Sequence, residues 1–352
     1  MAKLRAAIIG CGRKGDSKLR TGCGIAHQHV AAYTASDDAE LVALCDLVAA
    51  RAEAFRDEHG SGDERIYTDC REMLRTEKPD IVSICVWPAA HARLTLACAA
   101  AGVRAVHCEK PMAVTWGDAK RMAAACEQAG VQLTFNHQRR FGPPFRKVRQ
   151  LVGDRAVGKL LRIEAYTGNL YDWGTHWFDM MFFFNGDVPA EWVLGQIDPG
   201  DSRSVFGAPL EGQGLAMLHF ANGVYGLMCT GKLAPHNVEF RLIGTEGTIE
   251  LGRPGEAGLR IMGKGRDGWE VLDAKPQLHG RDFHAAAVAD AIDALKAGRE
   301  PELSARKALQ TTEVIFAAYE SSRRGARVDL PLDVDDSPLA ALLAAGGRGA
   351  RR

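Results

Sequence analysis

The sequence predicts an α/β protein with a doubly wound parallel sheet in its first part and a second α/β domain built on a large, mostly antiparallel open sheet. From residue 4 to about 135, short apolar β-branched runs alternate with longer helix-like segments, which is typical of βαβ units. Residues 190–272 hold strand-like runs joined by turns, which favours antiparallel pairing. The 352 residues suffice for two domains of roughly 150 residues each.

The first part reads as five strands joined by four helices. We predict strands at 4–10, 39–45, 80–86, 103–108 and 131–135, and helices at 25–35, 48–59, 89–101 and 115–129. Two of these helices end at Gly102 and Gly130, where glycine adopts the left-handed cap conformation readily.

The pattern changes near residue 140, where Phe141-Gly142-Pro143-Pro144 interrupts the periodicity. We therefore predict domains at 1–138 and 139–335, with a flexible tail at 336–352. The second domain is predicted to hold strands at 160–167, 191–197, 214–220, 224–230, 237–243 and 247–251, and helices at 145–152, 281–297 and 304–323.

Composition points to a small-molecule ligand and a reducing compartment. Lys and Arg total 44, as do Asp and Glu, so the charge balance favours neither nucleic acid nor a membrane surface as a partner. The nine cysteines form no C-x-x-C pair, and free thiols fit the cytoplasm. We find no targeting sequence and no apolar run near the ~18 residues of a membrane span.

The first predicted strand ends in Gly10-Cys11-Gly12, the opening of a G-x-G-x-x-G phosphate loop. An insertion, residues 13–23, separates it from Gly24 and Ile25, which open the next helix; Gly15 is an alternative third glycine. The insertion is either a basic flap over the cofactor or a surface excursion. Asp46 ends the second strand, where a carboxylate binds ribose hydroxyls and repels a 2′-phosphate, so NAD is favoured over NADP.

Two further groups can carry chemistry. Lys110 follows the fourth strand in Glu109-Lys110-Pro111, at the edge where ligands bind, although a solvated lysine fits as well. Asp172, His176 and Asp179 share one helical face, and a histidine beside a carboxylate can take a proton from an alcohol. An N-cap aspartate and a packed histidine are the alternative. Asp172 and His176 also have metal-pair spacing, but no third ligand is evident, so we predict no metal site.

These motifs, in this order, resemble the Gfo/Idh/MocA family of glucose-fructose oxidoreductase and inositol dehydrogenase relatives. Three landmarks add to the resemblance: Pro88-x-x-His91, Arg139-Arg140-Phe141-x-Pro143 and Gly244-Thr245-Glu246-Gly247.

The resemblance implies a Rossmann NAD-binding domain, a second domain used for homodimer or homotetramer formation, and a substrate pocket between them. In family terms His176 is the general base, Lys110 donates hydrogen bonds to the reacting oxygen, and Asp172 orients the pair. The implied cofactor-binding residues are Gly10, Gly12, Gly24, Ile25, Asp46, Trp87, Pro88, His91, Glu109 and Lys110. The implied substrate-binding residues are Lys110, Arg139, Tyr171, Asp172 and His176.

The leading hypothesis is an NAD-dependent dehydrogenase that oxidises a secondary hydroxyl of a sugar, a sugar derivative or an inositol. Tyr166, Tyr171, Trp173 and Trp177 gather near His176 and suit a sugar ring, although such a cluster is also typical of a core. One alternative is a glycosidase or epimerase that recycles a tightly bound NAD. Another is a non-catalytic sugar or nucleotide sensor, in which we expect at least one of Lys110, Asp172 and His176 to be replaced.

Overall fold

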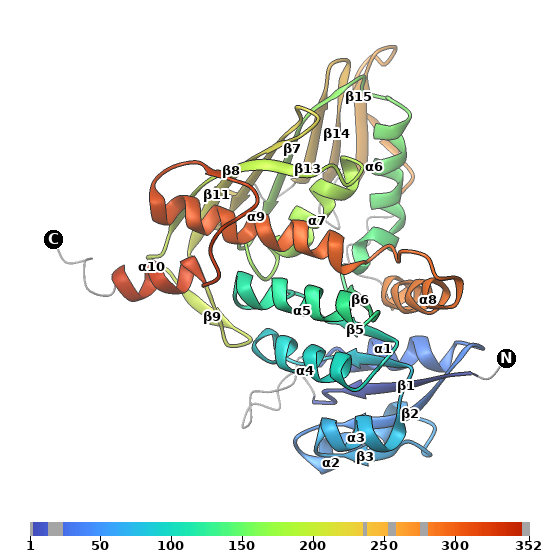
Figure 1. Ribbon diagram of the computed structural model, residues 1–352. Coiled ribbons are helices and arrows are strands. Elements are labelled where there is room, and N and C mark those ends of the chain that lie inside the picture. Colours follow the sequence, from blue (N-terminus) through green and yellow to red (C-terminus); the bar gives the residue numbers. More distant parts are fainter. Residues whose placement is uncertain (1–2, 13–23, 235–237, 253–257, 275–280, 347–352) are drawn as a thin grey trace. The chain divides into compact units, whose positions relative to one another are not determined.

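The computed structural model describes residues 3–12, 24–234, 238–252, 258–274 and 281–346, which form two compact units (Figure 1). The first unit comprises residues 1–138, 206–208 and 281–309, and the second comprises 139–205, 209–280 and 310–352. The chain therefore passes from the first unit to the second after Gln138, close to the point where the strand and helix periodicity of the sequence is interrupted.

Two segments differ from the predicted domain layout. Residues 281–309 group with the first unit rather than with 139–335, because helix α8 (Arg281–Ala297) packs against the first helix of the chain. The predicted tail contains helix α10 (Pro338–Gly346), and its Ala and Leu residues are strong helix formers.

The first unit is built on a six-stranded parallel sheet in the order β3-β2-β1-β4-β5-β6. This is the strand order of the doubly wound dinucleotide-binding fold, so the predicted fold class is confirmed. The strands are β1 (Leu4–Ile9), β2 (Ala39–Cys45), β3 (Arg65–Tyr67), β4 (Ile81–Ile84), β5 (Ala105–Cys108) and β6 (Gln132–Phe135). The helices between them are α1 (Ala26–Thr34), α2 (Ala49–His59), α3 (Cys70–Glu77), α4 (Pro88–Ala100) and α5 (Trp116–Gln128).

Burial of apolar strands and helix faces holds this unit together. Every residue of β4 and β5 is buried, as expected for central strands covered on both faces. Val288 and Ile292 of α8 join Val30 and Tyr33 of α1 in one apolar cluster. This packing explains why α8, although distant in sequence, belongs to the first unit.

The second unit is built on a nine-stranded mixed sheet in the order β16-β15-β14-β13-β7-β12-β11-β8-β17. Its pairings are antiparallel except for β7 with β12, which run parallel. The strands are β7 (Leu160–Thr167), β8 (Ala190–Asp198), β11 (Gln213–Phe220), β12 (Tyr225–Thr230), β13 (Val238–Gly244), β14 (Gly247–Gly252), β15 (Leu259–Gly263), β16 (Glu270–Leu272) and β17 (Val328–Asp329). A separate two-stranded ribbon pairs β9 (Arg203–Val205) with β10 (Ala208–Leu210).

The chain enters this unit through the 3-10 turn η1 (Gln138–Phe141) and helix α6 (Pro143–Gly153). Helices α7 (Gly174–Phe184) and α9 (Ala305–Arg324) lie on one face of the sheet (Figure 1). A side chain at Gly195 of β8 would meet the Ala318 carbonyl oxygen of α9 at 2.5 Å, so the glycine permits this close packing. Every residue of α7 is buried. Within the described part of the chain, no helix is both long and apolar enough to cross a membrane.

Candidate active site

A cavity of about 480 Å³ opens where β1, β2, β3 and β4 end, and its lining includes Gly10, Asp46, Asp69 and Trp87. Gly10 has a φ of 98°, and a Cβ there would lie 2.5 Å from the Cys85 carbonyl oxygen. Only glycine fits this position. The cavity stands at the carboxyl ends of parallel strands, where doubly wound sheets bind nucleotides.

The Asp46 carboxylate is fixed in this cavity by the main chain. Its Oδ2 accepts a hydrogen bond from the Cys11 amide at 2.9 Å, and its Oδ1 accepts one from the Val48 amide at 3.0 Å. Each oxygen keeps lone-pair capacity for a second donor, as a ribose diol requires. Arg51 lies 4.0 Å from Oδ1. The residues present fit the adenosine end of NAD.

The predicted phosphate loop is described only at its two ends. Gly12 and Gly24 are described, and Gly24 has a φ of 65°, whereas the insertion 13–23, including Gly15, lies outside the described residues. Ile25 is the N-cap of α1, whose first turn contains no acidic residue. A helix N-terminus of this kind attracts a phosphate through its amides and dipole.

Trp87 and Pro88 begin α4 beside the cavity, and Trp87 contacts a residue from far along the chain. The Phe206 ring lies 6.2 Å from the Trp87 ring, centroid to centroid. Phe206 has a φ of 52°, an uncommon backbone conformation for a bulky residue. Phe206 therefore helps to form the wall that carries Trp87.

His91, which was predicted to bind the cofactor, lies against the main chain. The ring is fully buried, with Nδ1 3.0 Å from the Pro111 carbonyl oxygen and Nε2 3.0 Å from the Val86 carbonyl oxygen. Burial lowers the pKa of His91, although these carbonyls oppose the shift. His91 therefore holds the segment after Lys110 against the start of α4, and its contact with the cofactor stays a prediction.

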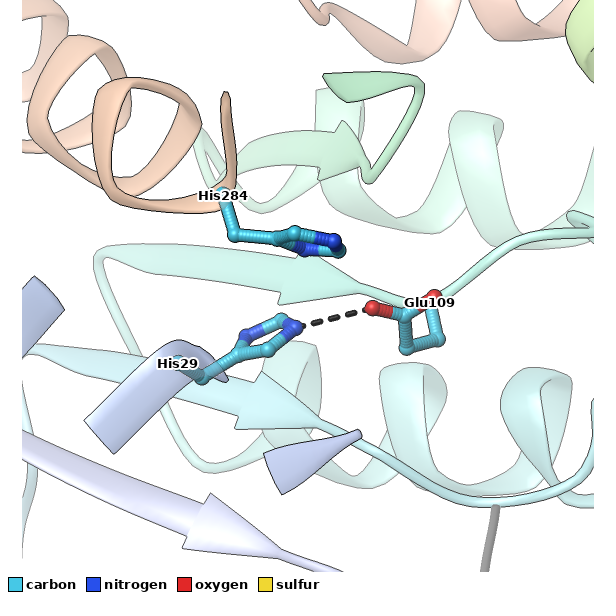
Figure 2. A group of neighbouring side chains, drawn as sticks. All are labelled: His29, Glu109 and His284. Atoms are coloured by element: carbon cyan, nitrogen blue, oxygen red, sulfur yellow. Dashed lines mark hydrogen bonds and ion pairs between the residues drawn. The ribbon is translucent and has the colours of Figure 1, made fainter. Parts of the chain in front are cut away.

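Glu109 follows β5 and lies in a cluster of polar side chains from the first unit (Figure 2). Its Oε1 lies 2.8 Å from His29 Nε2 and 2.6 Å from Asn136 Nδ2, and Asn136 Nδ2 lies 2.9 Å from His284 Nδ1. Burial opposes the charge on Glu109, but the hydrogen bond and charge of His29, with His284 and Asn136, outweigh it and lower the pKa of Glu109. Lys110, the next residue, is half-buried at the carboxyl end of β5.

Asp172 and His176 lie where α7 begins in the second unit. The Thr175 amide donates to the Tyr171 carbonyl at 3.1 Å, so a helical turn precedes α7 and the two side chains occupy successive turns. Asn169 caps this turn, since its Oδ1 accepts from the Asp172 amide at 2.6 Å and the Trp173 amide at 3.2 Å. The cap is therefore Asn169, not Asp172.

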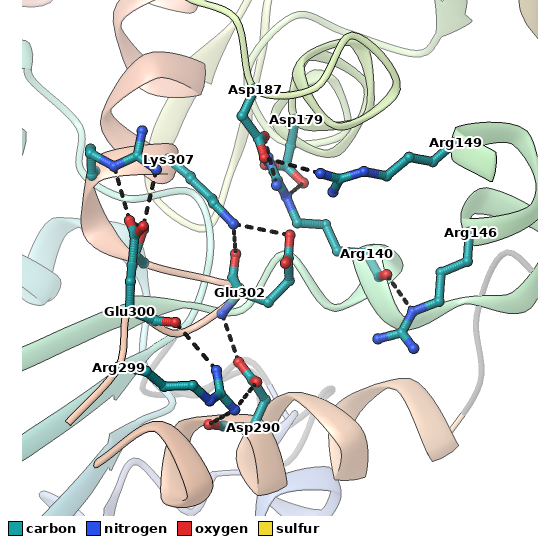
Figure 3. A network of polar contacts seen from close by, with 12 residues as sticks. Arg140, Arg146, Arg149, Asp179, Asp187, Asp290, Arg299, Glu300, Glu302 and Lys307 are labelled. Atoms are coloured by element: carbon teal, nitrogen blue, oxygen red, sulfur yellow. Dashed lines mark hydrogen bonds and ion pairs between the residues drawn. The ribbon is translucent and has the colours of Figure 1, made fainter. Parts of the chain in front are cut away.

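Asp179 forms a buried ion pair within the same unit (Figure 3). Arg140 Nε lies 2.9 Å from Asp179 Oδ2, and Arg140 Nη2 lies 2.8 Å from Oδ1, while Nη1 lies 2.8 Å from Asp187 Oδ1. Such bidentate geometry fixes both side chains. Arg140 and Asp179 therefore position α7.

Arg139 and Tyr171 were predicted to bind substrate, and their burial matters for that prediction. Arg139 is 0% exposed, with its guanidinium 4.0 Å from the centre of the Trp177 ring. Burial lowers the pKa of Arg139 to about 10, although Glu239 and Asp179 oppose the shift. Arg139 therefore packs on Trp177 in the interior of the second unit, and its contact with substrate stays a prediction. Tyr171 is also buried, which raises its pKa.

Both parts of the chain match models of one oxidoreductase family. Residues 4–137 match its NAD-binding Rossmann fold, and residues 163–330 match its C-terminal alpha/beta domain. The chain belongs to the Gfo/Idh/MocA oxidoreductase family. This confirms the resemblance drawn from the sequence motifs, and the protein is an NAD-binding oxidoreductase.

Named relatives of this Gfo/Idh/MocA protein act on sugars and cyclitols. It is 29% identical to the D-apiose dehydrogenase of Paraburkholderia graminis, over 93% of this chain and 90% of the relative. It is 27% identical to the myo-inositol 2-dehydrogenase of Thermotoga maritima, over 70% and 74% respectively. The crystal structure of WlbA dehydrogenase from Bordetella pertussis, in complex with NADH and UDP-GlcNAcA, has a TM-score of 0.75 at 25% identity and covers 94% of this chain and 100% of that one.

Sequence reasoning missed several residues of the site. His29 lies in the first helix and Asn136 follows a strand, and neither belongs to a recognisable motif. Phe206 and His284 come from distant parts of the chain, so no local pattern links them to the site. Asn169 did carry a usable signal, because asparagine just before a helix is a preferred cap.

Proposed function

We propose that this oxidoreductase uses NAD to oxidise a secondary hydroxyl of a sugar, a sugar derivative or an inositol. The observation that carries the proposal is the intact trio. Lys110 stands two residues after a central strand of the NAD-binding sheet, and Asp172 and His176 occupy successive turns of one capped helix start. A sensor that had lost catalysis would not need all three groups.

Each member of the trio has a distinct role in this proposal. His176 accepts the hydroxyl proton, because an imidazole exchanges protons near neutral pH. Lys110 donates a hydrogen bond to the reacting oxygen, and Asp172 orients His176 and accepts from a neighbouring substrate hydroxyl. NAD, when bound, supplies the hydride acceptor.

The substrate class rests on the relatives and on one aromatic surface. Trp173, next to Asp172, is 40% exposed, whereas Trp177 stacks on Phe240 in the core at 5.9 Å. An exposed ring beside polar groups suits the apolar face and hydroxyls of a sugar or cyclitol. The relatives named for D-apiose and myo-inositol support the same class.

A panel of aldoses, branched pentoses and inositols, each with NAD⁺, tests the proposal through NADH formation. We expect Lys110→Ala to lower kcat by about 10²- to 10⁴-fold, the usual contribution of a positioned proton-transfer or hydrogen-bonding group. Lys120→Ala is the matched control, because Lys120 is a surface lysine of α5. Unchanged turnover in Lys110→Ala contradicts the assigned site.

Nucleotide retention separates simple dehydrogenation from cofactor recycling. The purified protein is denatured, and any released nucleotide is identified by mass and absorbance. Stoichiometric NAD or NADH favours a glycosidase or epimerase that recycles its cofactor, whereas an empty protein that binds added NADH favours a dehydrogenase.

We also propose that the open face of the nine-stranded sheet forms a homo-oligomer. Pairing places Leu194, Met217 and Leu227 side by side across β8, β11 and β12. On these three strands Leu194, Leu215 and Tyr225 are exposed. The same face of β7, β13 and β14 carries the ion-paired Glu164, Arg241 and Glu250, so the apolar patch is confined to β8, β11 and β12. An exposed apolar patch marks an interaction site, and analytical ultracentrifugation of wild type and Leu194→Glu tests it.

A further inference from the structure

We propose that His29, Glu109 and His284 form a binding site for a divalent transition-metal ion of the zinc class. Their ligand atoms all lie within 4.8 Å of one another, and the three side chains converge from separate elements of the first unit (Figure 2). Two imidazole nitrogens and one carboxylate oxygen form an established ligand set for zinc. Magnesium and calcium prefer oxygen ligands throughout.

The hydrogen bonds behind the ligands hold them in place. His29 Nδ1 lies 3.0 Å from Ser83 Oγ, which in turn lies 2.8 Å from Tyr33 Oη, so the ring is oriented with Nε2 toward Glu109. The second carboxylate oxygen of Glu109 accepts from the Lys110 amide at 3.2 Å. Metal-binding histidines and carboxylates are typically oriented by such outer partners.

The Asn136 amide lies where the three ligand atoms converge. Its Nδ2 is 3.4 Å from His29 Nε2, 2.6 Å from Glu109 Oε1 and 2.9 Å from His284 Nδ1. A fourth polar side chain therefore stands beside the three.

Asn136 supplies a fourth ligand. Its Oδ1 is buried and has no hydrogen-bond partner among the described residues. Rotation of the amide plane brings this oxygen to face the other three ligand atoms, and the two orientations of an asparagine amide are nearly indistinguishable in shape. Two nitrogens and two oxygens give four ligand atoms, the number that structural zinc sites usually have.

The ion ties α1 and α8 to the ends of β5 and β6, and it fixes Glu109, the residue before Lys110. Metal binding itself does not depend on the proposed function, since it is measured without substrate or NAD. Only the consequence for Lys110 rests on that function.

Cobalt substitution provides a direct test. The chain is treated with a chelator, dialysed and titrated with Co²⁺, and the visible d–d bands of a four-coordinate nitrogen and oxygen site are recorded. We expect one Co²⁺ per chain, displaced by Zn²⁺, and binding at least about 100-fold weaker in His284→Ala, since even loss of an outer partner costs 10- to 100-fold. His27→Ala is the matched control, because His27 is half-buried on the same helix as His29 and is not one of the three ligands.

A second variant keeps the proposal testable if His284→Ala folds poorly. Asn136→Asp adds a carboxylate to the cluster, so we expect a lower thermal midpoint in chelator and a midpoint restored by Zn²⁺. Absence of saturable Co²⁺ binding to the wild type overturns the proposal. So does equal binding by the wild type and His284→Ala, or a midpoint of Asn136→Asp that Zn²⁺ does not move.

Discussion

Each unit holds a buried carboxylate close to a member of the proposed catalytic trio, and the two carboxylates are neutralised differently. Glu109, before Lys110, faces the His29 imidazole at 2.8 Å. Asp179, three residues after His176, is bound by the Arg140 guanidinium at 2.8 Å. A guanidinium stays charged and binds a carboxylate through two parallel hydrogen bonds, whereas an imidazole offers a single nitrogen to a carboxylate. The carboxylate near His176 is therefore held in a closed ion pair, and the one near Lys110 lies in a hydrogen-bonded cluster.

The largest expected effect concerns the guanidinium pair. Arg140→Met leaves Asp179 buried without its counter-charge, which costs about 3–5 kcal/mol of unfolding free energy. Urea unfolding measures the loss. The double variant Arg140→Met/Asp179→Leu should recover much of it, because the Asp179 charge is removed and Asp187 keeps Arg149 at 3.8 Å. A single variant within about 1 kcal/mol of the wild type contradicts the role given to this pair.

A third buried carboxylate, Asp46, differs from both because main-chain amides hold it, and each of its oxygens can still accept a hydrogen bond from a ligand. Asp46→Ser removes the acceptor for the ribose hydroxyls, and we expect NADH to bind about 10- to 100-fold more weakly, from hydrogen bonds worth roughly 1.5–3 kcal/mol. NADPH should lose much less affinity, since the carboxylate no longer repels the 2′-phosphate. Fluorescence titration measures both, with Asp57→Ser, an exposed carboxylate of α2, as control. Equal losses of affinity for NADH and NADPH contradict the proposal that Asp46 binds the ribose hydroxyls.

The proton sensitivity of the first unit is tested through His107, which packs 5.1 Å from His29, ring to ring. Burial lowers the pKa of His107 to about 3, so the folded chain keeps it neutral while the unfolded chain protonates it near pH 6.5. Stability should fall as pH drops below about 6.5, by up to about 1.4 kcal/mol per pH unit from this group. Urea unfolding from pH 7 to pH 5 should show a smaller loss of unfolding free energy in His107→Gln than in the wild type. An equal loss per pH unit in both proteins contradicts the role given to His107.

The smallest effect concerns the cap that places Asp172. Asn169→Ala removes the acceptor for the Asp172 and Trp173 amides, and we expect a loss of about 1 kcal/mol in unfolding free energy together with a lower kcat. Asn169→Asp keeps an oxygen acceptor and should restore both values. If Asn169→Ala lowers stability but leaves kcat unchanged, Asn169 does not position Asp172 for catalysis.

Regular features of the chain allowed the first unit to be predicted from sequence. The apolar runs of β1, β4 and β5 are continuous, and the spacing from Gly24 to Asp46 matches a nucleotide-binding unit. Strand β3 escaped prediction because its three residues are partly exposed and include Arg65. Helix α3, which follows it, is short.

Tertiary placement is what the sequence did not show. Arg139 and Arg140 are identical neighbours, yet one stacks on Trp177 and the other binds Asp179, because successive side chains of a turn point in different directions. His284 meets Glu109 only because α8 returns to the first unit. No local pattern encodes such a return, so this cluster could not be predicted from motifs.

A single-turnover experiment tests most directly whether hydride moves from substrate to NAD with the help of Lys110. A substrate from the panel, deuterated at the carbon that is oxidised, is mixed with the NAD-loaded protein, and the nucleotide is released by denaturation and weighed by mass spectrometry. We expect a nucleotide that carries one deuterium in the wild type and in Lys120→Ala, and an unlabelled nucleotide in Lys110→Ala. An unlabelled nucleotide from wild type that consumes substrate, or full labelling in Lys110→Ala, contradicts the proposed hydride transfer and the role of Lys110.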